Sequence, residues 1–346
     1  MRTIIKGMPI PELEGVIQGL GHSGYRAKQL FRWVHQKKIN NFQDMSDLSK
    51  AFRTECDTRF ELPQLAVHEQ HESSDGTIKY VIRLSDDKKV EAVYIPAEDR
   101  QTLCISTQVG CKMACAFCAT GYQKFSRDLK SWEIVDQLFV VNTPKPITNI
   151  VLMGMGEPFD NYDEVMRALQ IFSHPFGPQI GKRHITVSTV GISDKIEAFI
   201  KADIAKLAIS LHGTTDEQRS KIMPINKKYP LTELMDLCRS LTMKRGLRVT
   251  FEYVLLKDLN DSDEDARRLV KLVRDIPCKL NLLAYNENPF IDIKRPAEER
   301  VLAFQKILLE AHLTTTYRRS RGRDIGAACG QLTTKKADKP ALPSPL

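Results

Sequence analysis

The sequence of 346 residues contains no long apolar run. Its longest apolar stretches, such as Ile150–Met153 and Tyr253–Leu256, are far shorter than the roughly 18 residues that a membrane-spanning helix needs. The first residues also lack the apolar region and the small-residue cleavage site of a secretion signal. We therefore expect a cytoplasmic protein with no membrane partner.

The composition excludes wholesale disorder and a disulfide-stabilised miniprotein, because 42% of the residues are hydrophobic and 27% are charged. The net charge of +8 hints at a polyanionic partner such as nucleic acid. Between Tyr317 and Lys336, six Lys and Arg side chains accompany a single acid, Asp324. Such a run is as often a solvated terminal face as a binding surface.

Helices are predicted in the first sixty residues. Apolar residues recur at helical spacing on both sides of the turn Gly21–Gly24, which predicts a helical hairpin, and a third helix is expected over Asp47–Arg59. A helical hairpin can bind a nucleic-acid backbone, but it is more often plain scaffold. The segments Thr77–Leu84 and Lys89–Ile95 then predict a β-hairpin.

From residue 102 onward, strand-like and helix-like segments alternate, which predicts a parallel sheet that is either doubly wound or curled into a partial barrel. The expected strands are Leu103–Thr107, Ile150–Met153, Ile185–Thr189, Leu207–Leu211, Arg248–Leu256 and Leu280–Tyr285. The expected helices are Ser131–Asn142, Tyr162–Ser173, Ser193–Lys201, Leu231–Arg245, Ser262–Asp275 and Ala297–Ala311. The tail, residues 334–346, is expected to be disordered because it lacks apolar periodicity.

Three of the eight cysteines lie within eight positions, which in a cytosolic chain points to metal or redox chemistry rather than to disulfides. Cys111, Cys115 and Cys118 follow the first expected strand with the spacing C-x₃-C-x₂-C. A structural zinc site takes four ligands, and no fourth Cys or His follows at finger-like spacing. Three thiolates suit a four-iron cluster that keeps one iron open for another ligand.

Other unusual residues gather where the expected strands end, which is where a barrel carries its chemistry. The second strand ends in Gly154–Pro158, where glycines let a ligand approach the backbone and Glu157 can hold an ammonium group. Taken alone, His212 is more often a hydrogen-bonded strand-end histidine than a catalytic base. The candidates for cofactor contacts are Gly156, Glu157, Ser188, Ser210, Leu211, His212 and Asn286.

As a set, the segments CISTQVGCKMACAFCATG, MGMGEP, VSTVG, SLH and AACGQL resemble the RlmN-type dual-specificity RNA methyltransferases, a family of radical S-adenosylmethionine enzymes. The resemblance runs from about Gly24 to Leu332. It implies an α/β fold with a radical S-adenosylmethionine partial (βα)6 barrel at residues 101–333, an RNA-binding helical domain at 1–65 and a β-hairpin connector at 66–100. The implied cofactors are a 4Fe-4S cluster on the three clustered cysteines and S-adenosyl-L-methionine.

The resemblance also implies partners and a mechanism. The substrates would be an adenosine of 23S rRNA and one beside the anticodon in tRNA; an electron donor such as flavodoxin or ferredoxin would serve a monomeric enzyme. Cys329 would carry the methyl group that is transferred to adenine carbon-2, and Glu91 would accept a proton. Cys104 would then attack the Cys329 sulfur, releasing the RNA and leaving a disulfide. By pattern alone, Cys104 is more often a buried core residue, and Cys329 is an even choice between core and reactive thiol.

Several readings compete with this one. A sister family methylates carbon-8 of the same ribosomal adenosine, but it has alanine where this chain has Pro158, which favours carbon-2. Two alternatives remain. One is another radical S-adenosylmethionine enzyme, such as a glycyl-radical activase, and the other is a non-catalytic zinc-stabilised RNA-binding module.

If RNA is the substrate, we expect it to be handled by the residues Arg219, Lys221 and Asn226, with the basic C-terminal segment on phosphates.

Overall fold

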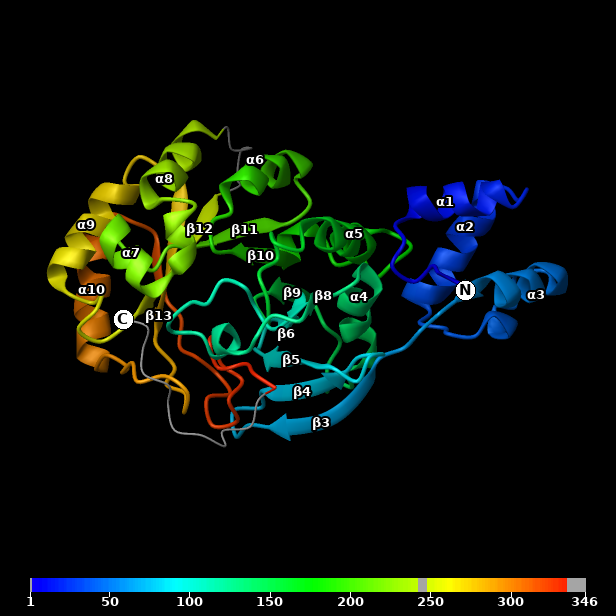
Figure 1. Cartoon of the computed structure of the whole chain (residues 1–346), viewed down its shortest axis with the longest axis horizontal. Coiled ribbons are helices and arrows are strands. Elements are labelled where there is room, and N and C mark those ends of the chain that lie inside the picture. The colour runs from blue at the N-terminus through cyan, green and yellow to red at the C-terminus, as the bar shows by residue number, and fades with distance from the viewer. Residues whose placement is uncertain (1, 242–247, 335–346) are drawn as a thin grey trace.

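A computed structural model describes residues 2–241 and 248–334 of the chain. Nearly all of the tail that was expected to be disordered therefore lies outside the described residues, as does the end of the helix expected over Leu231–Arg245. A smaller helical unit formed by the first sixty residues stands beside a larger α/β body (Figure 1). None of the described helices is long and apolar enough to cross a membrane.

A ten-stranded sheet forms the body, with the strand order β14-β13-β12-β11-β10-β9-β6-β5-β4-β3. From β6 onward, the strands of this sheet pair in parallel, each beside the next strand of the same sheet along the chain. A doubly wound sheet would reverse its order at a switch point, so the unbroken order confirms the expected partial barrel. These strands are β6 (Gln101–Cys104), β9 (Asn149–Leu152), β10 (Ile185–Thr189), β11 (Lys206–Ser210), β12 (Val249–Leu255), β13 (Cys278–Ala284) and β14 (Thr315–Tyr317).

Amphipathic helices connect the parallel strands and cover the outer face of the sheet (Figure 1). Their apolar stripes pack on strands that are buried on both faces, which is the usual reason for a continuous apolar run in a parallel sheet. The helices are α4 (Ser131–Val140), α5 (Tyr162–Ser173), α6 (Ser193–Ala202), α7 (Asp216–Ile222), α8 (Leu231–Ser240), α9 (Asp263–Val273) and α10 (Glu298–Glu310). The short, strongly charged α7 and the three-residue β14 were not expected, because neither shows a clear apolar period.

Three antiparallel strands extend the same sheet beyond β6. The expected hairpin corresponds to β4 (Ile78–Arg83) and β5 (Lys89–Pro96), and β3 (Ala66–Glu72) adds an edge strand that the sequence did not predict. Every residue of β3 is exposed, so its sequence lacks the apolar alternation that announces a strand. Because β5 pairs directly with β6, the hairpin is continuous with the barrel sheet.

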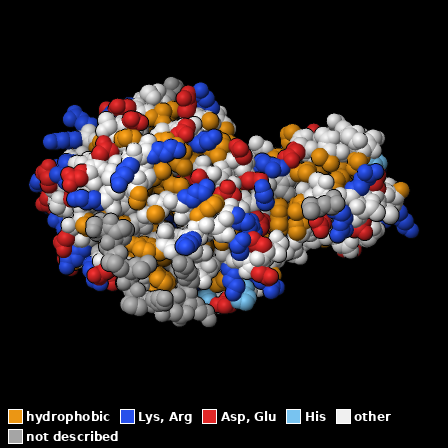
Figure 2. All heavy atoms as spheres, viewed as in Figure 1, with side chains coloured by type: hydrophobic (Ala, Val, Ile, Leu, Met, Phe, Trp, Pro, Cys, Tyr) orange, Lys and Arg blue, Asp and Glu red, His pale blue; other side chains and the backbone are white. Residues whose placement is uncertain are grey.

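The N-terminal unit consists of α1 (Ile10–Gly19), α2 (Gly24–Phe31), a π-helical turn (Arg32–Gln36) and α3 (Lys50–Arg59). Its apolar core is continuous with the core of the barrel. Both lobes carry Lys and Arg side chains interspersed with acids on the face shown in Figure 2, so the excess positive charge does not form one patch there.

A buried ion pair joins the two lobes. The Lys6 ammonium lies 2.5 Å from a carboxylate oxygen of Asp136 on α4, and both side chains are almost completely buried. Lys6 also donates to the carbonyl oxygen of Pro63, while the second Asp136 oxygen accepts from the backbone N–H of Leu65 at 2.6 Å. Such charges are tolerated in a protein interior only when they are paired and hydrogen-bonded, as here.

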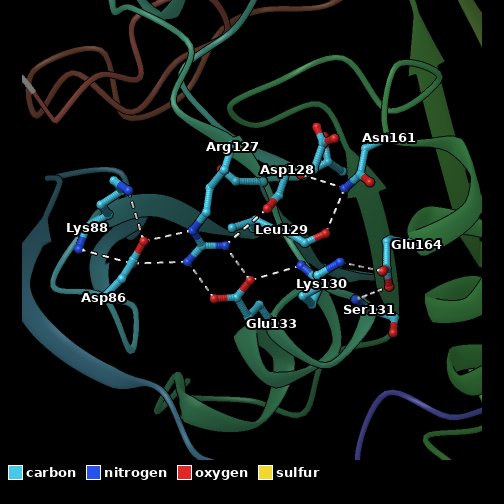
Figure 3. A network of polar contacts seen from close by, with 12 residues as sticks. Asp86, Lys88, Arg127, Asp128, Leu129, Lys130, Ser131, Glu133, Asn161 and Glu164 are labelled. Carbon is cyan, nitrogen blue, oxygen red and sulfur yellow. Dashed lines mark hydrogen bonds and ion pairs between the residues drawn. The ribbon is translucent and has the colours of Figure 1, made fainter.

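An arginine-centred network secures the segment that leads into α4 (Figure 3). Arg127, on the short strand β8 (Arg127–Asp128), binds Asp86 in the β4–β5 turn and Glu133 on α4 through paired hydrogen bonds. The hydrogen bonds from Arg127 hold the pKa of the Asp86 carboxyl well below its usual value. The network therefore ties the antiparallel extension of the sheet to the first helix of the barrel.

Candidate active site

The three clustered cysteines lie on one closed loop after β6. The strand β7 (Gln108–Val109) pairs with β8, which brings the two ends of the loop together. Gly110 has a positive φ of 76°, and a Cβ atom there would lie 2.4 Å from the Lys124 carbonyl oxygen, so only glycine fits this closure. The backbone N–H of Ala116 donates to the carbonyl oxygen of Ile222 at 2.9 Å, which fixes the loop against α7.

The surroundings of these cysteines fit an iron–sulfur cluster. Cys115 is buried among apolar side chains, and Cys111 and Cys118 pack against the same group. Burial, with a smaller contribution from the neighbouring Cys118, raises the pKa of Cys111 to about 12. A buried thiolate needs a compensating cation, and three sulfur donors on one loop are the ligands that iron prefers.

No three His, Cys, Asp or Glu side chains among the described residues converge on a single-ion position. In a four-iron cluster each cysteine binds a different iron, so its ligands need not converge on one point. The loop would hold the cluster through Cys111, Cys115 and Cys118, which remain the predicted ligands.

The turn after β9 places Glu157 inside the site. Gly156 has a φ of 98° and passes so close to Gln108 that a Cβ atom would lie 2.5 Å from the Gln108 Cβ. The two carboxylate oxygens of Glu157 accept hydrogen bonds from the backbone N–H groups of Phe159 and Val190, each at 2.9 Å. Burial nevertheless raises the pKa of Glu157 to about 7. A cationic ligand group nearby would favour its charged form.

The remaining predicted contacts line the ends of neighbouring strands. Ser188 and Ser210 are half-buried near the ends of β10 and β11, and Leu211 is fully buried. His212 follows Leu211, is buried, and lies edge-on to the Phe117 ring of the cysteine loop, with 4.9 Å between ring centroids. Burial lowers the pKa of His212 to about 3, with a smaller effect from Arg219, so the ring is neutral near pH 7.

Arg219 and Asn226 were expected to handle the RNA substrate, but both side chains are buried. The Arg219 side chain is completely buried, and its guanidinium donates to the carbonyl oxygens of Leu211, at 3.0 Å, and Ser210, at 3.2 Å. The Asn226 side chain accepts from Arg219 at 2.7 Å. Lys221 is exposed and pairs with Glu217 on the same helix. The Arg219 guanidinium also donates to the carbonyl oxygen of Val190, after β10, at 2.5 Å. Arg219 therefore holds the ends of β10 and β11 together rather than binding phosphate, a role that a basic residue in a charged helix does not reveal by sequence.

The C-terminal segment after β14 contacts both the antiparallel extension and the cysteine loop. We call residues 318–334 the C-terminal strap. Its Asp324 accepts from the Ser73 hydroxyl at 2.6 Å, and the backbone N–H of Gly322 donates to Asp75, so the strap is bound to the β3–β4 turn. At its other end, the Gly330 carbonyl oxygen accepts from the backbone N–H of Ala119 at 2.7 Å. The strap therefore spans from the antiparallel extension to the cysteine loop.

Cys104 and Cys329 line one cavity of about 160 Å³. Cys104 is the last residue of β6 and is buried, whereas Cys329 lies on the strap and is exposed. Asn286, the predicted cofactor contact at the end of β13, donates to the Cys329 carbonyl oxygen at 3.1 Å. Burial, with a smaller contribution from the Cys329 sulfur, raises the pKa of Cys104 to about 12. The same cavity is lined by the cations Arg100, Arg318, Arg319 and Arg321.

Glu91 is buried on β5 beside the strap, although a polar residue in a hairpin strand usually faces solvent. One carboxylate oxygen lies 3.2 Å from the Lys79 ammonium, and the other accepts from the backbone N–H of Thr333 at 2.9 Å. Burial raises the pKa of Glu91. The structure thus places all three predicted catalytic residues at the strap. Glu91 binds Thr333 of the strap, and Cys104 lines the same cavity as Cys329.

Comparison with known proteins identifies the family. The family described as Radical SAM superfamily matches residues 105–270, and the one described as Ribosomal RNA large subunit methyltransferase N-terminal domain matches residues 5–62. The chain is 47% identical to the dual-specificity RNA methyltransferase RlmN 2 of Myxococcus xanthus, over 92% of this chain and 87% of the relative. It is 47% identical to the RlmN of Geobacter sulfurreducens, over 96% and 92% of the two chains. The chain belongs to the RlmN family of dual-specificity RNA methyltransferases.

A solved structure agrees with this assignment. A radical SAM methyltransferase from Sphaerobacter thermophilus superimposes with a TM-score of 0.89 at 39% identity, covering 96% of this chain and all of that one. Membership of the RlmN family confirms the expected fold, the methyltransferase activity and the two cofactors, the 4Fe-4S cluster and S-adenosyl-L-methionine. The zinc-stabilised module and the glycyl-radical activase are therefore wrong as readings of this sequence.

Proposed function

We propose that the chain methylates carbon-2 of one adenosine in 23S rRNA and of the adenosine beside the anticodon in tRNAs. The observation that carries the proposal is the cavity lined by both Cys104 and Cys329, next to the cysteine loop. The relatives named dual-specificity RNA methyltransferases support two RNA substrates. They do not favour the carbon-8 alternative, and neither does Pro158 after Glu157.

In this proposal, Cys329 is the methyl carrier because it is the exposed thiol of the pair, on a strap that reaches the cysteine loop. Its thiolate accepts a methyl group from one S-adenosylmethionine, which leaves as S-adenosylhomocysteine. A cluster held by Cys111, Cys115 and Cys118 would, with a second S-adenosylmethionine, supply the radical chemistry that removes a hydrogen atom from the Cys329 methyl group. The Cys329 methylene then bonds to the adenine carbon and links the RNA to the protein.

Release requires a proton acceptor and a second thiol. Glu91 takes the proton, and its contact with Thr333, four residues after Cys329, keeps it near the adduct. The adduct also loses its one unpaired electron, for which the bound cluster would be the acceptor. The Cys104 thiolate then attacks the Cys329 sulfur, so that the bond from sulfur to the methyl carbon breaks, the carbon takes up a proton and a disulfide forms. Arg318, beside both thiols, lowers their pKa values and so favours their thiolate forms.

The RNA would be gripped mainly by phosphate contacts to the N-terminal unit and to the arginines at the mouth of the cavity. Two RNAs with different surroundings must share a shape, which favours recognition of a stem that presents an unstacked adenosine. We further propose that the enzyme is a cytoplasmic monomer that receives electrons from a flavodoxin or ferredoxin.

Nucleoside analysis tests the proposal directly. RNA is isolated from a strain that lacks its own RlmN-type enzyme, with and without this gene, and rRNA and tRNA are digested separately for mass spectrometry. We expect 2-methyladenosine to return in both RNAs, and a Cys329→Ala variant to restore neither. Return of 8-methyladenosine would establish the carbon-8 alternative, and return in only one RNA would refute dual specificity.

A further inference from the structure

Asn260 lies outside every motif discussed so far, in the loop between β12 and α9, and it is completely buried. Its side-chain oxygen accepts from the backbone N–H of Leu256 at 2.7 Å. Its side-chain nitrogen donates to two carbonyl oxygens, that of Val254 at 2.7 Å and that of His212 at 2.8 Å. One amide thus joins the end of β12 to the residue that follows β11.

Side-chain hydrogen bonds here replace the backbone hydrogen bonds that β12 would make if β11 continued beyond Ser210. The strand β11 ends at Ser210, and the Leu211 carbonyl oxygen, which could have continued the ladder, accepts from Arg219 instead. The N–H and carbonyl groups of Val254 would then lack partners, and unpaired buried backbone groups are costly. The His212 ring takes up the N–H group, and the Asn260 amide takes up the carbonyl oxygen.

His212 has a left-handed backbone, with a φ of 54°. This region is unfavourable for residues other than glycine and persists only where the surroundings enforce it. Two hydrogen bonds hold it here: the backbone N–H of Gly213 donates to the Leu211 carbonyl oxygen at 2.8 Å, and the Asn260 amide donates to the His212 carbonyl oxygen at 2.8 Å. Without the Asn260 bond, the chain after Leu211 could relax to a more favourable conformation and move the ring.

The same contacts decide which nitrogen of the His212 ring carries the proton. The Nδ1 atom accepts from the backbone N–H of Val254 at 3.1 Å, so it has no proton of its own. The proton of the neutral ring is therefore on Nε2. This leaves Nε2–H as a hydrogen-bond donor in a ring that packs against Phe117, between two of the cluster cysteines.

We propose that Asn260 is a positioning residue of the cofactor site: it holds His212 in the left-handed conformation and so keeps the ring as an Nε2–H donor beside the cysteine loop. The chemistry that fits a fixed neutral donor is an acceptor atom of the bound S-adenosylmethionine. The inference concerns the cofactor site alone, so it does not depend on which adenine carbon or which RNA is methylated.

The first test measures cofactor affinity in Asn260→Asp, with the 4Fe-4S cluster loaded and oxidised. The aspartate keeps the shape but turns an acceptor oxygen toward two carbonyl oxygens, so we expect S-adenosylmethionine to bind at least about tenfold more weakly by calorimetry. The matched control is Gln101→Ala, which removes another buried amide, one that donates to the Ala97 carbonyl oxygen. Gln101 is the first residue of β6, whereas the cysteine loop follows the last residue of that strand. This control should lose stability but keep its cofactor affinity. Unchanged affinity in a folded, iron-loaded Asn260→Asp protein would overturn the proposal.

The second test needs no variant of Asn260 that folds. Nitrogen-15 NMR of histidine-labelled wild-type protein reports the protonation of each ring nitrogen, and the His212 signals are assigned as those missing from His212→Gln. We expect protonated Nε2 and unprotonated Nδ1 at neutral pH. A protonated Nδ1 or a mixture of tautomers in the wild type would refute the proposal even if every Asn260 variant failed to fold.

Discussion

The N-terminal unit and the barrel share one apolar core, but their polar groups serve different ends. Every predicted catalytic, cofactor and cluster residue lies in the ten-stranded sheet, in the loops that follow its strands or in the strap. In the N-terminal unit, buried polar groups attach the unit to the barrel. Lys6 pairs with Asp136 on α4, and the Gly7 carbonyl oxygen accepts from the Ser131 hydroxyl. Glu12 adds a bridge to Arg167 on α5.

The helix that receives this unit also supports the site. Gln137, next to Asp136 on α4, exchanges two hydrogen bonds with the backbone of Ser106, at 2.9 and 2.8 Å. The Ser106 hydroxyl in turn donates to the Glu91 carbonyl oxygen and accepts from the backbone N–H of Met155. The comparison shows that α4 has two roles: Asp136 attaches the N-terminal unit, which contains no predicted catalytic residue, and Gln137 supports the backbone of the candidate active site.

Replacing the three cluster cysteines with alanine should have the largest effect and should leave the N-terminal unit untouched. The triple variant of Cys111, Cys115 and Cys118 should bind no iron after anaerobic reconstitution, because no other described side chains offer a comparable set of thiolates. Iron analysis and the visible absorbance of the cluster measure this. Cys56→Ala, a buried cysteine of the N-terminal unit, is the control and should keep four irons. A triple variant that retains four irons would break the assignment of the chemistry to the barrel.

Cys104→Ala should stop turnover after the RNA has bonded to Cys329, since the thiol that releases it is missing. We expect RNA that stays attached to the protein in denaturing gels, and that disappears on nuclease digestion. Cys238→Ala, a buried cysteine on α8, should release its product normally. Free methylated RNA at the wild-type rate from Cys104→Ala would show that Cys104 has no part in release.

Breaking the buried pair tests how the two lobes are joined. Lys6→Met leaves Asp136 buried without its cation, so we expect the free energy of unfolding to fall by about 3–5 kcal/mol in urea titrations. The double variant Lys6→Met with Asp136→Leu should recover much of the loss, because two apolar groups replace two charges. Lys28→Met, which removes an exposed partner of Glu14, should cost at most about 1 kcal/mol. Equal losses in the single and double variants would argue against an unpaired charge as the cause.

Arg319→Ala asks whether the barrel shares RNA binding with the N-terminal unit. If Arg319 contacts a phosphate, the slope of log affinity for tRNA against log salt concentration should become shallower by about 1. Filter binding at several salt concentrations gives this slope. Lys306→Ala, on the outer face of α10, is expected to leave it unchanged. The same slope in both variants would place the phosphate contacts elsewhere.

The smallest effect is expected from Asp86→Asn, which weakens the network around Arg127. The native pKa of Asp86 lies below its unfolded value near 4, so the carboxylate stabilises the fold fully above that pH and loses its contribution as the pH falls below it. Because Asp86 is about one-third exposed, at 34%, we expect a loss of about 1 kcal/mol at pH 7 that shrinks toward pH 3. Unfolding titrations from pH 3 to 7 measure the difference. Asp87→Asn in the same turn is the control, and a loss that does not change with pH would contradict the explanation.

Much of the barrel was predictable because its signals are local. The strand Ile185–Thr189 and the helix Tyr162–Ser173 have the predicted bounds, since an apolar run and a helical stripe depend only on neighbouring residues. The edge strand β3 was missed because its partner β4, rather than its own apolar pattern, makes it a strand. Arg219 was misread because its guanidinium joins the ends of two strands, donating to the carbonyl oxygens of Val190 after β10 and Ser210 in β11, which no local pattern encodes.

The sequence by itself determined the family, the cysteine spacing and the alternation of strands and helices, because each depends on residues close together in the chain. Only the tertiary structure placed Cys329 in the same cavity as Cys104, 225 residues earlier. It also buried Glu91 against Thr333 of the strap and bonded the Asn260 amide to the His212 carbonyl oxygen. Those arrangements depend on which strand ends become neighbours when the sheet curls and on which buried polar groups must then find partners. Both are properties of the folded chain as a whole.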